Sequence, residues 1–303
     1  MNCLNCGLDS LELWSTVRDE EYGTMPDQKF DYYRCPSCET LSIGETLEDR
    51  LGEIYPKTYY SFESKNYNLL YKIKFAMDSL FYKKISRKFK FPDALKVLDI
   101  GGGTGEVLRV FERALSQKRI SGTVIDLDNK VHGAVSEKGY EYICGSFLTH
   151  DFKDKKFDVL IALNILEHVE DPNLFLRQCS SLLRPGGVIL IQTPNWQSLD
   201  ARLFRRSYWG GLHAPRHFVI FSKKSLSGSL ESAGFELAFR SDAPAGPFWT
   251  WSVLGSLSGK GRSLKPLHKS PFFPVLAAVF TLFDFFTRGI RSTSQQLVVA
   301  KKK

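Results

Sequence analysis

The sequence predicts an α/β fold in which a mostly parallel sheet carries helices on both faces. From about residue 93 onward, apolar segments of strand length alternate with amphipathic helical segments. A glycine-rich loop joins the first of these strands to its helix. Two cysteine pairs near the start add a small module in front of the sheet.

Length and composition bound the class of protein. The 303 residues suffice for one large domain or two unequal ones, and 43% hydrophobic with 24% charged residues is typical of a soluble globular chain. The net charge of +8 either favours an anionic partner, such as nucleic acid, a membrane surface or a phosphorylated substrate, or serves solubility. The start "MNCLNCGLDS" lacks the features of a secretory signal, and no apolar stretch approaches the roughly 18 residues of a spanning helix. We therefore expect the cytoplasm.

Four of the six cysteines form two pairs within residues 1–50, Cys3-x-x-Cys6 and Cys35-x-x-Cys38. Each pair lies at a tight turn, "NCLNCG" or "RCPSCE", and a strand-like "KFDYYRC" lies between them. Four thiolates fill the tetrahedral shell of a structural zinc ion, and disulfides are uncommon in the cytoplasm. The spacing predicts a zinc-ribbon-like module without an open coordination position. The other two, Cys144 and Cys179, have apolar neighbours and are expected in the core.

The first strand and its glycine loop lie in "ALKVLDIGGGTGEVLRVFERAL", residues 94–115. Such a loop lets a ligand approach backbone N–H groups at a helix start, which suits NAD, ATP or S-adenosylmethionine. Glu106 stands where the dinucleotide pattern needs its third glycine. Asp99 ends the strand and places a carboxylate where a pyrophosphate would lie. A cationic ligand without phosphate is favoured, and S-adenosylmethionine carries both a sulfonium and an ammonium.

Further motifs follow in order: "GTVIDLD" (122–128), "YICGSFLT" (142–149), "KFDVLIALNILEHVEDP" (156–172), "LLRPGGVILIQTPN" (182–195) and a last strand, "QQLVVAKK". On these motifs the chain resembles the class I S-adenosylmethionine-dependent methyltransferases over residues 93–242 and 294–303. The resemblance implies a Rossmann-like seven-stranded sheet. It also implies a cofactor site made by Asp99, Gly101, Gly103, Gly105, Asp126, Leu127, Ser146, Phe147, Asn164 and His168. Ser146 departs from the family, which usually has aspartate there.

The loop after the fourth strand carries Glu167 and His168. These two residues could cap the following helix, contact the cofactor or help to bind a cation. The loop lacks the Asp/Asn-Pro-Pro-aromatic sequence common in enzymes that methylate nucleobase amines. "LEHVEDP" instead resembles the ubiquinone- and menaquinone-biosynthesis methyltransferases.

The segment "GLHAPRHFVIFS" follows the fifth strand, where the resemblance places a histidine-containing loop beside the methyl group. Its arrangement also resembles bacterial methyltransferases associated with cell-surface sugars. We expect His213 or His217 to accept the acceptor's proton, with His213 preferred, and Arg216 to hold an anionic group on the acceptor. Alternatively, a histidine packs on Trp209 or Tyr208 while Arg216 braces the loop. Ser222 is a natural helix N-cap.

Two segments lie outside this core. Residues 51–92 predict a helical cap in which the aromatics of "YPKTYYSF" precede a helix that ends in a basic run, "YKKISRKFK". Residues 243–293 form a hydrophobic and basic helical insert before the last strand. A helix from Val275 would have one narrow polar stripe, made by Ala277, Thr281, Asp284 and Arg288. It predicts a dimer face, an extra core helix or peripheral membrane contact through 272–291, with Lys260, Arg262, Lys265 and Lys269 before it.

The sequence therefore predicts a methyltransferase that acts on a hydroxyl, or on a carbon, of a small molecule, sugar, nucleotide-sugar or lipid-linked glycan intermediate. The alternative is a ribosomal RNA methyltransferase, because a zinc module and positive charge also occur together in that class. Residues 1–50 hold only four basic residues among many acids, which makes nucleic acid the weaker interpretation. A scaffold that binds the cofactor without catalysis is a third alternative.

Overall fold

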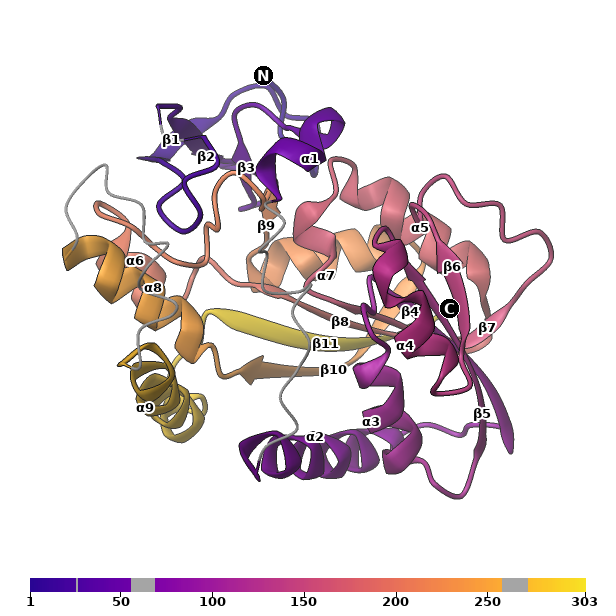
Figure 1. Ribbon diagram of the computed structural model, residues 1–303. Helices are drawn as coiled ribbons and strands as arrows, with labels where there is room; N and C mark the ends of the chain where they lie inside the picture. The colour runs from indigo at the N-terminus through magenta and orange to yellow at the C-terminus, as the bar shows by residue number, and fades with distance from the viewer. Residues whose placement is uncertain (26, 56–68, 258–271) are drawn as a thin grey trace.

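The computed structural model describes residues 1–25, 27–55, 69–257 and 272–303. A central sheet carries helices on both sides, and a small strand-rich module that contains the N-terminus lies along one edge of the molecule (Figure 1). The segment 56–62, which includes most of "YPKTYYSF", and the basic residues of 260–269 lie outside the described residues.

Two sheets contain all the named strands. The module strands are β1 (Glu12–Val17), β2 (Phe30–Arg34), β3 (Leu41–Ile43) and β9 (Val219–Ile220). The main sheet holds β4 (Ala94–Ile100), β5 (Arg119–Asp126), β6 (Glu141–Cys144), β7 (Phe157–Leu163), β8 (Leu183–Pro194), β10 (Phe235–Ala243) and β11 (Gln295–Lys302). The helices are α1 (Leu51–Ile54), α2 (Leu69–Ser86), α3 (Glu106–Ala114), α4 (His132–Ser136), α5 (Pro172–Leu182), α6 (Leu199–Phe204), α7 (Lys223–Ser232), α8 (Gly246–Leu257) and α9 (Phe272–Thr287).

The main sheet has seven strands in the order β10-β11-β8-β7-β4-β5-β6. Strands β4 to β8 pair in parallel, whereas β11 runs antiparallel to both β8 and β10. The chain thus reverses its strand order between β4 and β7, where ligands of open α/β sheets bind beyond the carboxyl ends of the strands. The predicted seven-stranded α/β architecture is confirmed.

Each face of the sheet has its own apolar core, because successive side chains of a strand point to opposite faces. Leu98 and Ile100 of β4 belong to the larger cluster, together with residues of α5, α7 and the N-terminal module. Val97 packs on the other face with Tyr82 of α2 and Phe111 of α3. Cys179 is buried as predicted, but Cys144 is exposed, because it ends the edge strand β6 rather than lying inside the core.

The N-terminal module shares its core with the main domain. Strand β3 pairs antiparallel with β9, so the segment after β8 completes the module's sheet. The Trp14 ring packs edge-on against Trp196 and Trp209, with ring centroids 6.3 and 6.2 Å apart. The segment from Trp196 to Ile220, which contains the histidine loop (211–222), is therefore packed against the N-terminal module.

The insert before β11 forms the helix pair α8 and α9 at one end of the sheet (Figure 1). Most of the apolar side chains of α9 are exposed, so its interpretation as an extra core helix is wrong. Among the described residues, none of the helices combines the length and the apolar character needed to span a membrane.

Candidate functional site

The glycine loop lies where β4 ends and α3 begins, at the carboxyl edge of the parallel strands. Gly101 has φ +65°, and an added Cβ there would lie 2.1 Å from Ile165 of the loop after β7. Gly103 has φ +52°, and an added Cβ would meet nothing within 4 Å. The loop is thus closed toward Ile165 and open at Gly103, which leaves the room that a ligand needs to approach the backbone.

Two carboxylates flank this open position. Asp99 is 2% exposed at the end of β4. Asp126 ends β5, where its Oδ2 accepts the Gly103 N–H at 2.9 Å and its Oδ1 accepts the Asp128 N–H at 3.0 Å. Each carboxylate oxygen can accept a second hydrogen bond, so Asp126 can also receive the ribose hydroxyls of a nucleoside. Their negative charge favours a cationic sulfonium and disfavours a pyrophosphate.

The remaining predicted cofactor residues are arranged in different ways. Leu127 is 63% exposed directly after Asp126, where its side chain can pack on an adenine ring, and Ser146 is half-buried in the loop after β6. The Phe147 ring packs inward on Phe175, 4.9 Å between centroids, so a contact with the ligand would have to come from its main chain. Asn164, with φ +57°, binds its neighbours: its side chain donates to Glu167 at 3.1 Å.

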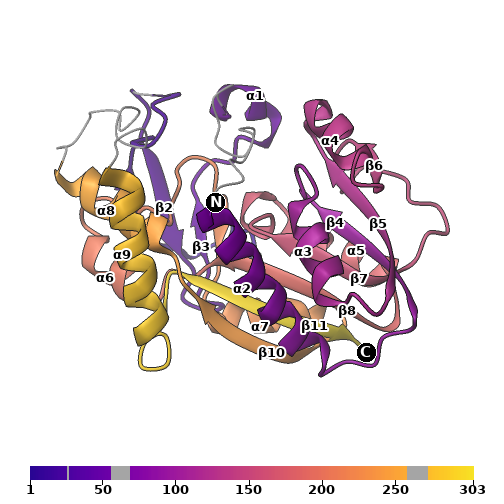
Figure 2. The same cartoon turned by 60° about the horizontal axis from the view of Figure 1, so that its bottom comes forward.

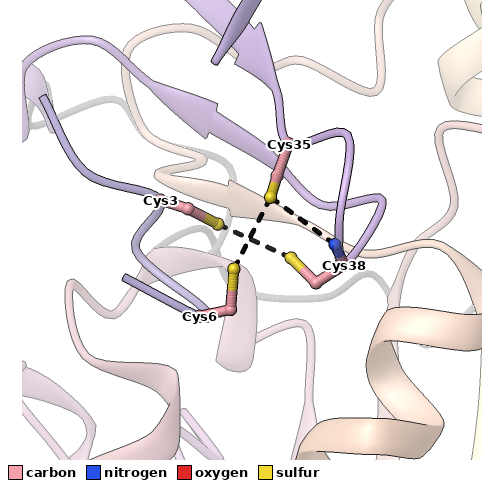
Figure 3. Close-up of side chains that lie close together, drawn as sticks. All are labelled: Cys3, Cys6, Cys35 and Cys38. Atoms are coloured by element: carbon pink, nitrogen blue, oxygen red, sulfur yellow. Dashed lines mark hydrogen bonds between the residues drawn. The ribbon is translucent and has the colours of Figure 1, made fainter. Parts of the chain in front are cut away.

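The four module cysteines form one cluster (Figure 3). The Sγ atoms of Cys3 and Cys38 are 3.6 Å apart, and those of Cys6 and Cys35 are 3.5 Å apart. These distances are far longer than a disulfide bond and close to the roughly 3.8 Å edge of a zinc–sulfur tetrahedron. The donor set and spacing fit zinc.

The pKa values of these thiols also support a bound cation. The hydrogen bond from the Cys3 thiol, against the opposing effect of burial, lowers the pKa of Cys38 to about 4. The same hydrogen bond and burial raise the pKa of Cys3, and burial raises the pKa of Cys6. Four thiolates at these separations would repel one another, and a structural zinc ion would compensate their charge.

The histidine loop is held by an acidic loop of the N-terminal module, residues 18–29 between β1 and β2. The guanidinium of Arg216 is fully buried, and its Nη2 donates to both oxygens of Asp19 at 3.0 Å. The Arg216 Nε donates to the Ile54 carbonyl at 3.0 Å. In this structure Arg216 therefore braces the loop. The predicted contact with an acceptor anion would require this ion pair to open, at a cost of several kcal/mol.

His213 is paired with a second carboxylate of the same acidic loop. Its Nδ1 lies 2.5 Å from Glu21 Oε2, and the Tyr208 hydroxyl donates to Glu21 Oε1 at 2.7 Å. Because a carboxylate only accepts, Nδ1 donates its hydrogen to Glu21, and in the neutral form of the ring the lone pair is on Nε2. His213 also has φ +42°, a conformation that few residues other than glycine adopt and that is common at functional sites. This carboxylate–histidine pair can act as a general base.

The rings of His217, which is buried, and His168, which is half-buried, lie 5.0 and 6.5 Å from the His213 ring, and the buried Glu167 lies beside these two histidines. Nδ1 of His217 donates to the Gly211 carbonyl at 2.9 Å, and Nδ1 of His168 donates to the Arg216 carbonyl at 2.9 Å. Their ligand atoms and a carboxylate oxygen of Glu167 all lie within 4.8 Å of one another, so the three could hold a cation. Helix α5 is instead capped by Asp171, so the interpretation of Glu167 and His168 as its cap is wrong.

Burial sets the charge of this cluster. Burial, the neighbouring His213 and the buried Arg216 together lower the pKa of His168 to about 3. Burial, with His168 and His213 nearby, also lowers the pKa of His217 well below its ordinary value. Burial raises the pKa of Glu167 to about 7. The imidazoles of His168 and His217 are thus neutral near neutral pH and available as metal ligands, but they are weak proton acceptors.

Sequence reasoning missed Asp19, Glu21 and Tyr55. Tyr55 lies at the end of α1, and its hydroxyl is 2.8 Å from His168 Nδ1. Asp19 and Glu21 belong to the run "RDEEY" between two strands of the module. Three consecutive acids in a short loop, complementary in charge to the histidine and arginine segment, were the signal that could have found them.

Comparison with known proteins agrees with this geometry. A family profile described as a methyltransferase domain matches residues 74–238, more than half of the chain. Two ubiquinone biosynthesis O-methyltransferases are similar in sequence. The one from Nitrobacter winogradskyi is 29% identical over 171 residues, 52% of this chain and 64% of that protein. The one from Parvibaculum lavamentivorans is 35% identical over 113 residues, 36% of this chain and 44% of that protein.

The alignments span less than two thirds of each of these relatives. Among solved structures, a putative sarcosine dimethylglycine methyltransferase from Galdieria sulphuraria aligns with a TM-score of 0.53 at 14% identity, covering 82% of this chain and 91% of that one, which supports the fold. The chain belongs to the methyltransferase-domain family, with the sheet of the class I S-adenosylmethionine-dependent enzymes.

Proposed function

We propose that the protein is an S-adenosylmethionine-dependent O-methyltransferase in which His213, held by Glu21, removes the proton of the acceptor hydroxyl. The observation that carries this proposal is the buried pair of Glu21 Oε2 and His213 Nδ1 at 2.5 Å. The O-methyltransferase relatives support the choice of oxygen as the accepting atom.

The bound cofactor would supply an electrophilic methyl group on a sulfonium. The chain must align the acceptor with it, and such positioning is worth about 7–11 kcal/mol. A hydroxyl is a weak nucleophile at neutral pH, and a base that takes its proton contributes about 10²- to 10⁴-fold. His213 Nε2 is the proton acceptor, while Glu21 fixes the ring and stabilises the imidazolium that forms.

The acceptor we propose is a small molecule, a sugar, a nucleotide-sugar or a lipid-linked glycan intermediate. A buried base in a loop enclosed by the module and by α1 suits a single functional group inserted from a small acceptor. The alternative reaction is methylation of a carbon atom of a sugar, which also requires a base that removes a proton from the acceptor. We rank ribosomal RNA below these acceptors, because residues 1–50 hold only four basic residues among many acids.

The test uses purified protein and S-adenosylmethionine with a labelled methyl group. Lipid-soluble, small water-soluble and RNA fractions of a cell extract are supplied separately, and the labelled product is identified by mass spectrometry and NMR. We expect an O-methyl product in one of the first two fractions. We also expect His213→Ala to lose about 10²-fold or more in turnover.

His150→Ala, which replaces a histidine that packs on Phe152 away from the loop, is the matched control and should retain activity. Label confined to RNA would contradict the proposed acceptor class. Equal turnover in His213→Ala and wild type would contradict the proposed base.

A further inference from the structure

Helix α9 exposes an apolar stripe along its whole length. Its most exposed residues are Phe272 (72%), Val275 (59%), Val279 (55%), Leu282 (57%) and Phe286 (75%), and Ile290 just beyond the helix is 90% exposed. The spacing of three and four residues places these side chains on one side of the helix. A contiguous apolar surface of this kind marks an interaction site.

The inner side of α9 combines a buried carboxylate with aromatic rings that pack on α8, while its most exposed side is apolar, which is the reverse of an ordinary surface helix. Asp284 is the one residue of α9 that is fully buried. It accepts the Ala245 N–H at 2.8 Å and the Trp249 indole N–H at 3.0 Å, and it pairs with Arg291 at 2.7 Å. The Trp249 ring stacks on Phe280, 5.4 Å between centroids. These contacts fix α9 to α8 with its apolar stripe turned outward.

A second helix on the same side of the molecule adds positive charge. Figure 2 shows α2 and α9 lying across the face that comes forward, although they are far apart in sequence. Met77 (54%) and Leu80 (67%) of α2 are exposed. Lys84 and Arg87 follow at the same helical spacing and are also exposed. The face thus combines apolar side chains with cationic ones.

Charge decides which occupant fits this face. The acids of the two helices are Asp78, which is half-buried, and Asp284, which is paired inside. A second copy joined through a two-fold axis would bring the same cationic groups to the same face. An anionic lipid surface brings opposite charge, at about fivefold in affinity for each basic residue, and accepts the apolar side chains beneath its headgroups.

We propose that α9 and α2 form a docking face for an anionic membrane surface, here called the α9/α2 face, on which the protein binds peripherally. The 16 residues of α9 span about 24 Å as a helix, less than the roughly 30 Å of the hydrocarbon core. The helix therefore lies along the interface with Phe272, Leu282 and Phe286 inserted. This inference is independent of the proposed reaction, because binding is measured without methyl transfer.

The test is cosedimentation of the full chain with vesicles of phosphatidylcholine alone or of phosphatidylcholine mixed with phosphatidylglycerol. Wild type should bind the anionic vesicles at low salt and release partly at high salt. The triple variant Phe272→Ser, Leu282→Ser, Phe286→Ser should bind about 100-fold more weakly or worse. Lys84→Ala with Arg87→Ala should weaken binding roughly 20-fold. These side chains are exposed, so the variants should keep the wild-type melting temperature.

The matched control, Leu174→Ser with Arg177→Glu, changes an exposed apolar and an exposed basic residue of α5, on the other face of the sheet. It should bind vesicles like wild type, and equal loss in this control would overturn the proposal. Absence of binding to anionic vesicles at low salt would also overturn it. A third result would overturn it as well: wild type forms a dimer, the triple variant is a monomer, and neither protein binds vesicles. That result would assign the α9/α2 face to a second copy of the chain.

Discussion

The pairing of Glu21 with His213 gives a prediction that can be worked out in detail. Glu21 is 2% exposed, and its two oxygens hold the His213 Nδ1–H and the Tyr208 hydroxyl. Glu21→Gln keeps the size of the side chain and removes its charge. A hydrogen bond to a charged group is worth about 1.5–3 kcal/mol, so loss of the charge that stabilises the imidazolium should lower kcat about 10- to 100-fold. The KM for S-adenosylmethionine should change little, because Glu21 contacts the base and not the glycine loop.

The assay is initial-rate methyl transfer to the acceptor fraction, with a double-mutant cycle. Because Glu21 acts through His213, adding Glu21→Gln to His213→Ala should slow the enzyme no further. Binding of S-adenosylhomocysteine and the melting temperature serve as controls for folding. If Glu21→Gln slows the His213→Ala enzyme by the same factor as it slows wild type, Glu21 does not work through this histidine and the reasoning is refuted.

Two further perturbations test the scaffold of the site. Cys35→Ser should abolish stoichiometric zinc in metal analysis and reduce methyl transfer, because the module positions the loop that holds His213. Cys144→Ser, which changes a cysteine outside the cluster, should retain both zinc and activity. Full activity of Cys35→Ser without zinc would contradict this coupling. Arg216→Lys should lower the free energy of unfolding by about 3 kcal/mol in urea titrations, because lysine cannot form the bidentate pair with Asp19. Arg177→Lys, in an exposed pair, should change that free energy by less than about 1 kcal/mol, and equal effects in the two variants would refute the bracing role.

The sequence predicts the parallel sheet and the cysteine cluster because both depend on local patterns. The glycine bend after Asp99 and the Cys-x-x-Cys turns are each built by residues that are adjacent in the chain, so the spacing of these residues is enough to predict both features. Ser222 is confirmed as the cap of α7 for the same reason, since its hydroxyl accepts the N–H of Ser225 three residues on.

The histidine loop could not be assembled in this way. Its partners Asp19 and Glu21 lie almost two hundred residues earlier, and tertiary contacts such as the pairing of β3 with β9 and the packing of Trp14 on Trp209 bring them together. A lone arginine in the loop fits an anion site and a brace equally well until its partner is known. The role of the 243–293 insert was ambiguous for a related reason. The sequence shows that α9 is largely apolar, but it does not show that Asp284 is buried against α8 and leaves the apolar side exposed.

The central claim is that the loop from Asp99 to Gly105 and the carboxylate of Asp126 bind S-adenosylmethionine. Isothermal titration calorimetry with S-adenosylhomocysteine tests it most directly. The account predicts saturable one-to-one binding that weakens about tenfold or more in Asp126→Asn, which cannot accept the same hydrogen bonds from the ribose. Tight uptake of NAD or ATP, with no heat from S-adenosylhomocysteine, would contradict the account.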